Sequence, residues 1–341
     1  HIAPLSLAVF IISLSITHSF LDTLPSLYLG APENENALSV LPGQKMLLQG
    51  EGYQAVKITL LGTYSGMILA FILIPLFMFT SKQIFAFLKP YLPPLLIIIV
   101  AYMIIKETQR FLSFFLFLIS GTLGIIVFSI PNMREPLFPL LSGLFGVSGL
   151  IISYFENTNI PKQRITKKID IDMKSLLKSL LGSSVGVFFI QFFPGFGPAQ
   201  GAVISGQLIK DIKDKGYLAL VGAMGTMSVI FSLVTFYMLG KAKDGTIVVI
   251  SKLTEINQNG FLLLLFVFLF AGSLALPITL WFSRIFSKLI VKINYKLLVI
   301  GIIILIFLMA LILNGWIGVL ILITSSAIGL IAPLKGVARN H

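Results

Sequence analysis

A Pro-Gly-Phe-Gly-Pro sequence at residues 194–198 interrupts a long apolar stretch, and this break most constrains the fold. It separates an apolar arm of about fifteen residues, Ser179–Phe193, from one of about eleven, Ala199–Ile209. A helix needs roughly 20 residues to span a bilayer core, so neither arm is predicted to span alone. Proline and glycine forbid one continuous helix, and broken backbone at membrane depth survives only where protein or water covers it. We predict a re-entrant hairpin over residues 179–209 with its tip near the midplane; a kinked helix or a turn between two short spanning helices is the alternative.

The composition places this hairpin in a membrane protein. Of the 341 residues, 57% are hydrophobic and 11% charged, and the mean hydropathy is +0.99. A soluble domain cannot bury so much apolar surface, so we predict an all-α polytopic protein of the cell membrane. The net charge is +12, and the basic residues lie in short loops. This distribution is explained by the orientation of the chain in the membrane and by contact with anionic headgroups, rather than by nucleic-acid binding. With no cysteine and three histidines, neither a thiolate nor a His-rich metal site is expected.

Nine segments have the apolarity of spanning helices, so the predicted fold is about nine transmembrane helices plus the re-entrant hairpin. They are residues 3–21, 57–79, 91–105, 111–130, 137–155, 217–239, 260–283, 297–313 and 315–333. The basic loops 156–178 and 284–296 are placed in the cytoplasm by the positive-inside rule. Both ends of the hairpin then lie on the cytoplasmic side, as a re-entrant element requires.

Two stretches of the chain share a pattern that indicates an internal repeat. Residues 17–30 and 226–240 both read Thr-x-Ser, then apolar residues, then Ser/Thr-x-Tyr, and both end in Gly. The predicted topology makes them run in opposite directions, and inverted repeats are typical of secondary transporters. We therefore expect a first repeat over 1–155, a basic cytoplasmic linker over 156–178 and a second repeat over 179–341. On this plan the hairpin of the first repeat is missing from the chain, because it would precede residue 1.

Three blocks of the sequence resemble the tripartite tricarboxylate transporter permeases, the TctA-like large membrane subunits, and most closely their archaeal branch. The blocks are SITHSFLDTLPSLYLGAPENENALSVLPGQKMLLQGEGYQAV, FFPGFGPAQGAVIS and GTMSVIFSLVTFYMLGKAKDG. The resemblance implies two inverted repeats, each with a Pro-Gly hairpin, and ion-driven import of carboxylates. It also implies a small membrane subunit and an extracytoplasmic binding protein as partners. The tip, PGFGPAQG, departs from the more glycine-rich form of tricarboxylate importers.

The hairpin tip is the predicted substrate site. If Pro198 opens the second arm, the free N–H groups of its first turn and the positive end of the helix dipole face the site and suit an anion. Glutamine and serine side chains would add neutral hydrogen-bonding groups, or else join helices. The predicted substrate-binding residues are Pro194, Gly195, Phe196, Gly197, Pro198, Gln200, Ser26, Tyr28 and Tyr237, with Gln191 and Ser205 as further polar groups.

Asp22 is the sharpest single candidate for ion coupling, because it lies in an apolar context where a carboxylate is costly. His18 lies four residues earlier on the same helical face, so the pair is a candidate Na⁺ or H⁺ site. An interfacial Asp that caps the next segment is the alternative. Hydroxyl groups of the repeat would complete the set, or else pack helices. The predicted coupling-ion residues are Asp22, His18, Ser19, Thr226 and Ser228.

The sequence thus predicts a secondary transporter that moves a small carboxylate, coupled to Na⁺ or H⁺, with no other cofactor. Two functions stay open beside it: a lipid-phosphate carrier, such as one for polyprenyl phosphate, and a membrane scaffold that transports nothing. A homodimer is possible. An enzyme is not predicted, because no Walker A sequence, HExxH motif, nucleophile elbow or paired catalytic carboxylates occur.

Overall fold

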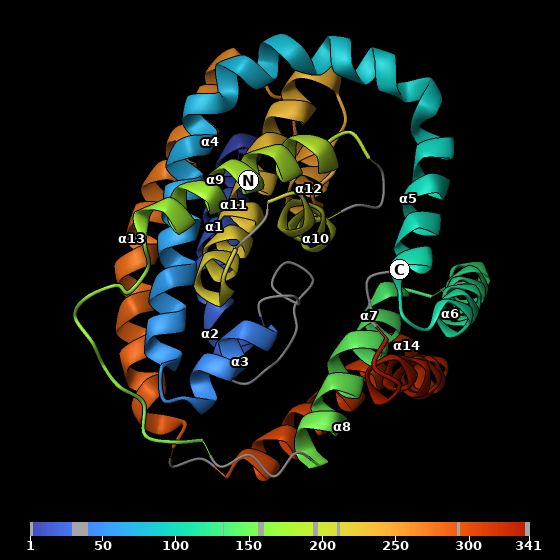
Figure 1. Cartoon of the computed structure of the whole chain (residues 1–341). Helices are drawn as coiled ribbons and strands as arrows, with labels where there is room; N and C mark the ends of the chain where they lie inside the picture. The colour runs from blue at the N-terminus through green and yellow to red at the C-terminus, as the bar shows by residue number, and fades with distance from the viewer. Residues whose placement is uncertain are drawn as a thin grey trace. The chain divides into compact units, whose positions relative to one another are not determined.

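A computed structural model of the chain describes residues 3–28, 40–131, 133–155, 160–193, 197–209, 212–291 and 294–337. These residues form helices joined by short connections, and within the described ranges there is no strand (Figure 1). The chain divides into two compact units. The first comprises the described parts of 1–29, 33–92 and 160–291, and the second those of 93–159 and 292–341. The first unit contains the predicted hairpin.

Two long helices form the centre of the first unit, α4 (Gly52–Leu88) and α11 (Asp214–Leu239). They pack through glycines: a Cβ at Gly62 would lie 2.7 Å from the Cα of Ala219, and one at Gly66 would lie 2.7 Å from the Cα of Ala223. Contacts that advance together along both helices show that α4 and α11 run parallel. Small residues allow such close approach without lipid between the backbones, and α11 is almost entirely buried.

A second pair of helices runs in the opposite direction. Helix α1 (Pro4–Leu21), continued by α2 (Thr23–Tyr28), lies along α13 (Gln258–Leu289). Gly272 approaches Ile16 of α1, and the Tyr28 hydroxyl reaches Ser283 further along α13. Gly272 also approaches Met67 of α4, whereas Arg284 of α13 donates to Tyr53 near the start of α4. Helix α13, and α1 with it, is therefore antiparallel to α4 and α11.

Two nine-residue helices connect these long helices. Helix α3 (Val40–Leu48) precedes α4, and α12 (Gly245–Leu253) precedes α13. Helix α3 is joined to the start of α11 by an ion pair of 2.7 Å between Lys45 and Asp214. Neither stretch is among the predicted helices, because nine apolar and polar residues without regular spacing give little helical signal.

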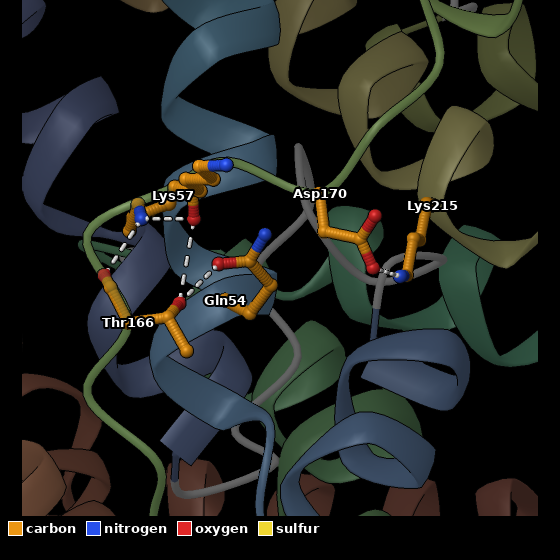
Figure 2. Close-up of polar contacts among 6 residues, drawn as sticks. Gln54, Lys57, Thr166, Asp170 and Lys215 are labelled. Carbon is orange, nitrogen blue, oxygen red and sulfur yellow. Dashed lines mark hydrogen bonds and ion pairs between the residues drawn. The ribbon is translucent and has the colours of Figure 1, made fainter.

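The predicted basic linker is bound to the first unit along residues 163–170 (Figure 2). Lys57 of α4 donates to the backbone carbonyl oxygens of Thr166, Lys167 and Lys168 at 2.9, 3.0 and 2.6 Å. Lys215 pairs with Asp170 from the first turn of α11. We call residues 163–170 the strap. Its backbone is held because the buried Lys57 ammonium needs acceptors that its own helix cannot supply.

The second unit is built around α14 (Tyr295–Leu334), with α5 (Leu92–Lys106), α6 (Arg110–Ser129), α7 (Leu137–Leu141), the π-helix η2 (Ser142–Val147) and α8 (Ser148–Phe155). A short 3-10 turn, η1 (Lys89–Tyr91), precedes α5. Gly143 of η2 approaches α14 so closely that a Cβ would lie 2.7 Å from the Leu322 carbonyl oxygen. A small residue thus lets η2 pack closely on α14 in this unit. No predicted site residue lies in it.

The predicted fold class is confirmed, and several boundaries are corrected. Within the described ranges, eight helices are long and apolar enough to cross a membrane. The segments 297–313 and 315–333 form one helix, α14, interrupted only by the backbone of Gly315 at φ 61°. The segment 91–105 corresponds to the short α5. The first hairpin arm begins at Met173 rather than Ser179 and, at 18 residues, is among the eight.

Candidate functional site

The predicted hairpin is present as two antiparallel helices, α9 (Met173–Ile190) and α10 (Pro198–Leu208). A Cβ at Gly201 would lie 3.0 Å from Ile190, and a Cβ at Gly186 would touch Ser205. A Cβ at Gly182 would touch Ile209. Because the partner numbers rise on α10 as they fall on α9, the two arms run in opposite directions. The open ends of the hairpin therefore lie together.

Three hydrogen bonds fix the depth of the hairpin on α11. The hydroxyls of Ser179 and Ser183 donate to the carbonyl oxygens of Gly216 and Leu220 at 2.7 and 2.9 Å. The Gln191 amide donates to the carbonyl oxygen of Ser228 at 2.9 Å. Each pair is 37 residues apart, so α9 runs parallel to α11 in constant register. The last of these bonds is at Ser228, which lies about 21 Å from the start of α11. The whole of α11 is about 39 Å long, if each residue rises 1.5 Å. The end of α9 thus lies roughly at the middle of α11.

At the tip, Pro194, Gly195 and Phe196 lie outside the described residues. Pro198 is the first residue of α10, as predicted, so the N–H groups of its first turn have no partner within the helix. The side-chain oxygen of Gln200 accepts from the Gly197 N–H at 3.0 Å. Gln200 therefore caps its own helix. Among the described atoms, that oxygen is the nearest to a Cβ at Gly197, at 3.4 Å.

The connection from α11 to α12 folds back into the same region. Helix α11 ends at Leu239, and Gly240 turns the chain with φ 66°. The Asp244 N–H then donates to the Ser232 hydroxyl at 2.9 Å, about 12 Å back along α11 from Gly240. Ser228 and Ser232 are one turn apart on the same face. The end of α9 and the start of α12 therefore meet α11 at neighbouring turns.

Two buried polar atoms in this region have no hydrogen-bond partner in the part of the chain that the structure describes. They are the side-chain oxygen of Gln191 and the ammonium nitrogen of Lys243. Burial lowers the pKa of Lys243 from 10.5 to about 8. Lys243 is not among the predicted site residues, because Lys241-Ala-Lys-Asp244 has the composition of a solvated loop. The sequence offered one signal, because these residues directly follow the glycine that ends the repeat pattern.

The structure does not bring the predicted tyrosines together. The Tyr28 hydroxyl is fully buried and bonded to the hydroxyls of Ser283 and Ser287 at 3.0 and 2.6 Å. Tyr237 stacks on Phe261 with ring centroids 4.3 Å apart. Ser283 and Phe261 lie on one helix, α13, at positions about 33 Å apart. Residues near the ends of antiparallel helices such as α1 and α11 lie at opposite ends of the bundle, so only positions near the middle can share one small ligand. Ser26 is buried near Tyr28, and its hydroxyl has no partner among the described residues.

The predicted coupling-ion residues fall in two places. His18 and Asp22 pair as expected, with 2.8 Å between the His18 Nδ1 and an Asp22 carboxylate oxygen, and the carboxylate is buried. The pair lies where α1 ends and α2 begins, and Ser19 beside it donates to the Ser15 carbonyl. Thr226 and Ser228 belong instead to the middle of α11. Thr226 donates to Gly222, and Ser228 accepts from the hairpin.

Comparison with known proteins agrees with this architecture. The profile of the Tripartite tricarboxylate transporter TctA family matches residues 1–341. The chain is also 30% identical over 296 residues to the uncharacterized protein MJ1079 of Methanocaldococcus jannaschii, which covers 85% of this chain and 72% of that protein. This relative is archaeal, in agreement with the predicted branch. No solved structure matches the chain. The chain is a multi-pass membrane protein and a transporter component, and it belongs to the Tripartite tricarboxylate transporter TctA family.

Proposed function

We propose that the protein is a secondary transporter that carries a small carboxylate anion, bound where the hairpin tip meets the middle of α11. The observation that carries this proposal is the register of α9 on α11, which ends at Ser228. A helical hairpin that stops halfway along a buried helix leaves backbone at a depth where an irregular chain needs cover or a ligand. Transporters place substrate sites at such interruptions.

The chemistry of the tip suits an anion. Helix α10 opens with Pro198, so the N–H groups of its first turn and the positive end of its dipole face the turn of the hairpin. At the start of α12, beside Ser232, the Asp244 carboxylate already accepts from the Thr246 N–H, so the donors proposed for the anion are those of α10. Neutral backbone donors bind an anion while permitting its release, which a transport cycle requires.

Coupling would use the His18–Asp22 pair. Its buried carboxylate can bind Na⁺ or a proton, and a carboxylate within a spanning helix is a functional candidate by default. We propose that ion binding at Asp22 and anion binding at the tip bias the same transition, in which one repeat moves relative to the other. A small membrane subunit and an extracytoplasmic binding protein complete the proposed system.

Ligand-induced thermal stabilisation of the purified chain tests the substrate. We would add succinate, malate, citrate or a short polyprenyl phosphate, each with and without Na⁺. A ligand at about 100 times its dissociation constant stabilises by roughly 2.7 kcal/mol. We expect a shift with a carboxylate and its loss in Gly197→Leu, because this side chain would enter the start of α10 beside the Gln200 oxygen. Gly121→Leu is the control, because a Cβ at Gly121 meets no described atom within 4 Å.

The remaining outcomes separate the rival functions. A shift only with polyprenyl phosphate would replace the carboxylate carrier by a lipid-phosphate carrier. No shift with any ligand, in folded protein, would favour the scaffold. For coupling, Asp22→Asn should keep carboxylate binding in the absence of Na⁺. In this variant, Na⁺ or a proton gradient should no longer stimulate carboxylate transport. Unchanged stimulation in that variant would remove Asp22 from the mechanism.

A further inference from the structure

Two lysines in the described part of the first unit have buried ammonium groups, and their surroundings differ. Lys57 is 6% exposed, and its ammonium donates to three carbonyl oxygens of the strap. The Lys243 ammonium is buried with no hydrogen-bond partner among the described residues. Leaving an ammonium unpaired in the interior costs free energy. Lys57 is thus explained by the fold, whereas the fold alone does not explain Lys243.

Lys243 lies beside the end of the hairpin. Its neighbour Asp244 is bonded to Ser232, one helical turn from the Ser228 carbonyl that holds Gln191. The unpartnered side-chain oxygen of Gln191 belongs to the same region. A residue next to Lys243 and the side chain of Gln191 therefore contact α11 at neighbouring turns, and the buried cation and the buried acceptor both lack a partner among the described residues.

We propose that Lys243 is the cationic contact of the transported anion, binding one carboxylate group of the substrate beside the hairpin tip. This inference rests on the proposed function, because it assigns a residue to that same substrate. An incoming carboxylate supplies the acceptor that the ammonium lacks, and a charge-assisted hydrogen bond is among the stronger contacts available. The depressed pKa of Lys243, about 8, agrees with an ammonium that lacks a counter-charge.

The other charged groups of the segment have their own contacts. Lys241 holds its ammonium over the ring of Phe85, 4.0 Å from the centroid. The Asp244 carboxylate accepts from the Thr246 N–H at the start of α12, so it serves as a helix cap. Lys241 therefore provides a matched control for Lys243, with the same charge in the same connection.

The test is the affinity of the purified full chain for citrate and malate, measured by calorimetry. We expect Lys243→Gln to weaken binding by about ten- to hundredfold, since hydrogen bonds to charged groups contribute roughly 1.5–3 kcal/mol. Lys243→Arg should recover part of the affinity because it restores the charge. Lys241→Gln should bind as the wild type does. Wild-type affinity in Lys243→Gln would overturn the role of Lys243 and leave the transporter proposal intact.

If the proposed function is wrong, the result is different, because the wild type itself will bind none of the carboxylates. The assignment of Lys243 is then wrong as well. If Lys243→Gln does not fold, the pH dependence of carboxylate binding by the wild type tests the proposal instead. Carboxylates are fully ionised between pH 7 and 9.5, while Lys243 loses its proton near pH 8. Affinity should therefore fall above pH 8 by up to about tenfold per pH unit. An affinity independent of pH over this range would overturn the proposal.

Discussion

Helices α1, α3 and α4 follow one another in the same manner as α11, α12 and α13. Each set has a long helix, then a nine-residue helix, then a long helix with an internal proline, Pro75 in α4 and Pro277 in α13. The first helices of the two sets, α1 and α11, carry the repeated sequence pattern and run antiparallel. An inverted repeat would have this order and direction, and the repeat itself stays a prediction. The two sets also interlock, since α4 packs on α11 and α1 on α13 (Figure 1).

The two sets differ in how their buried charges are satisfied. In the first, Lys57 is bonded to the strap and Asp22 to His18. Among its described residues, only the Ser26 hydroxyl is buried without a hydrogen-bond partner. In the second, Lys243 has no partner, and Gln191 and Ser205 of the adjoining hairpin also leave a buried oxygen unbonded. An unpaired ammonium costs far more than an unpaired hydroxyl. The comparison shows that, among the described residues, a buried ammonium without a hydrogen-bond partner occurs in the second set and not in the first.

Breaking the contact between the two sets should have the largest effect. Gly62→Ala places a Cβ 2.7 Å from the Cα of Ala219, and backbone cannot move aside as a flexible side chain can. We expect a loss of about 3 kcal/mol or more, above the usual range for overpacking. The measurement is thermal unfolding in detergent. Gly121→Ala, in a helix with open space at this position, should be neutral or slightly stabilising. Equal stability of the two variants would show that α4 and α11 are not held together through Gly62.

The next effect concerns the strap. Lys57→Met leaves the carbonyl oxygens of Thr166, Lys167 and Lys168 without their donor, and we expect a loss of about 1–3 kcal/mol. Proteolysis within residues 163–170 should become faster, because the strap loses its attachment to α4. Lys167→Met keeps those carbonyls bonded and serves as the control. If both variants resist protease as the wild type does, Lys57 does not hold the strap.

The sequence predicted the parts of this architecture that depend on composition and on local chemistry. The apolar segments, the separation of α9 from α10, the start of α10 at Pro198 and the His18–Asp22 pair all follow from spacing and residue type. Long-range contacts did not follow. Lys57 looked like the end of a helix, because its acceptors lie more than a hundred residues away. Lys243 looked solvated, because nothing local shows that the chain folds back to Ser232.

A lysine-to-methionine substitution, which should destabilise the protein at Lys57, should stabilise it at Lys243. Lys243→Met removes a buried unpaired ammonium, so the ligand-free protein should gain about 1–3 kcal/mol at pH 7. Because the pKa is about 8 when folded and 10.5 ordinarily, the unfolded chain binds more protons between these values. Wild-type stability therefore rises from pH 8 to 10.5, and the advantage of the variant shrinks over that range. Unfolding curves at pH 7 and 10 measure this. A variant less stable than the wild type at pH 7 would mean that Lys243 has a structural partner.

The smallest effect distinguishes two ligands of equal charge. Malate differs from succinate by one hydroxyl, and that hydroxyl can donate to the unpartnered Gln191 oxygen if the carboxylate binds Lys243. A neutral hydrogen bond contributes about 1 kcal/mol, so we expect malate to bind roughly fivefold more tightly. Gln191→Met should abolish this preference, while its lost amide contact with Ser228 weakens both ligands equally. A preference that survives in Gln191→Met would locate the hydroxyl elsewhere. Its disappearance would place both ends of one substrate on α11, between the hairpin and the start of α12.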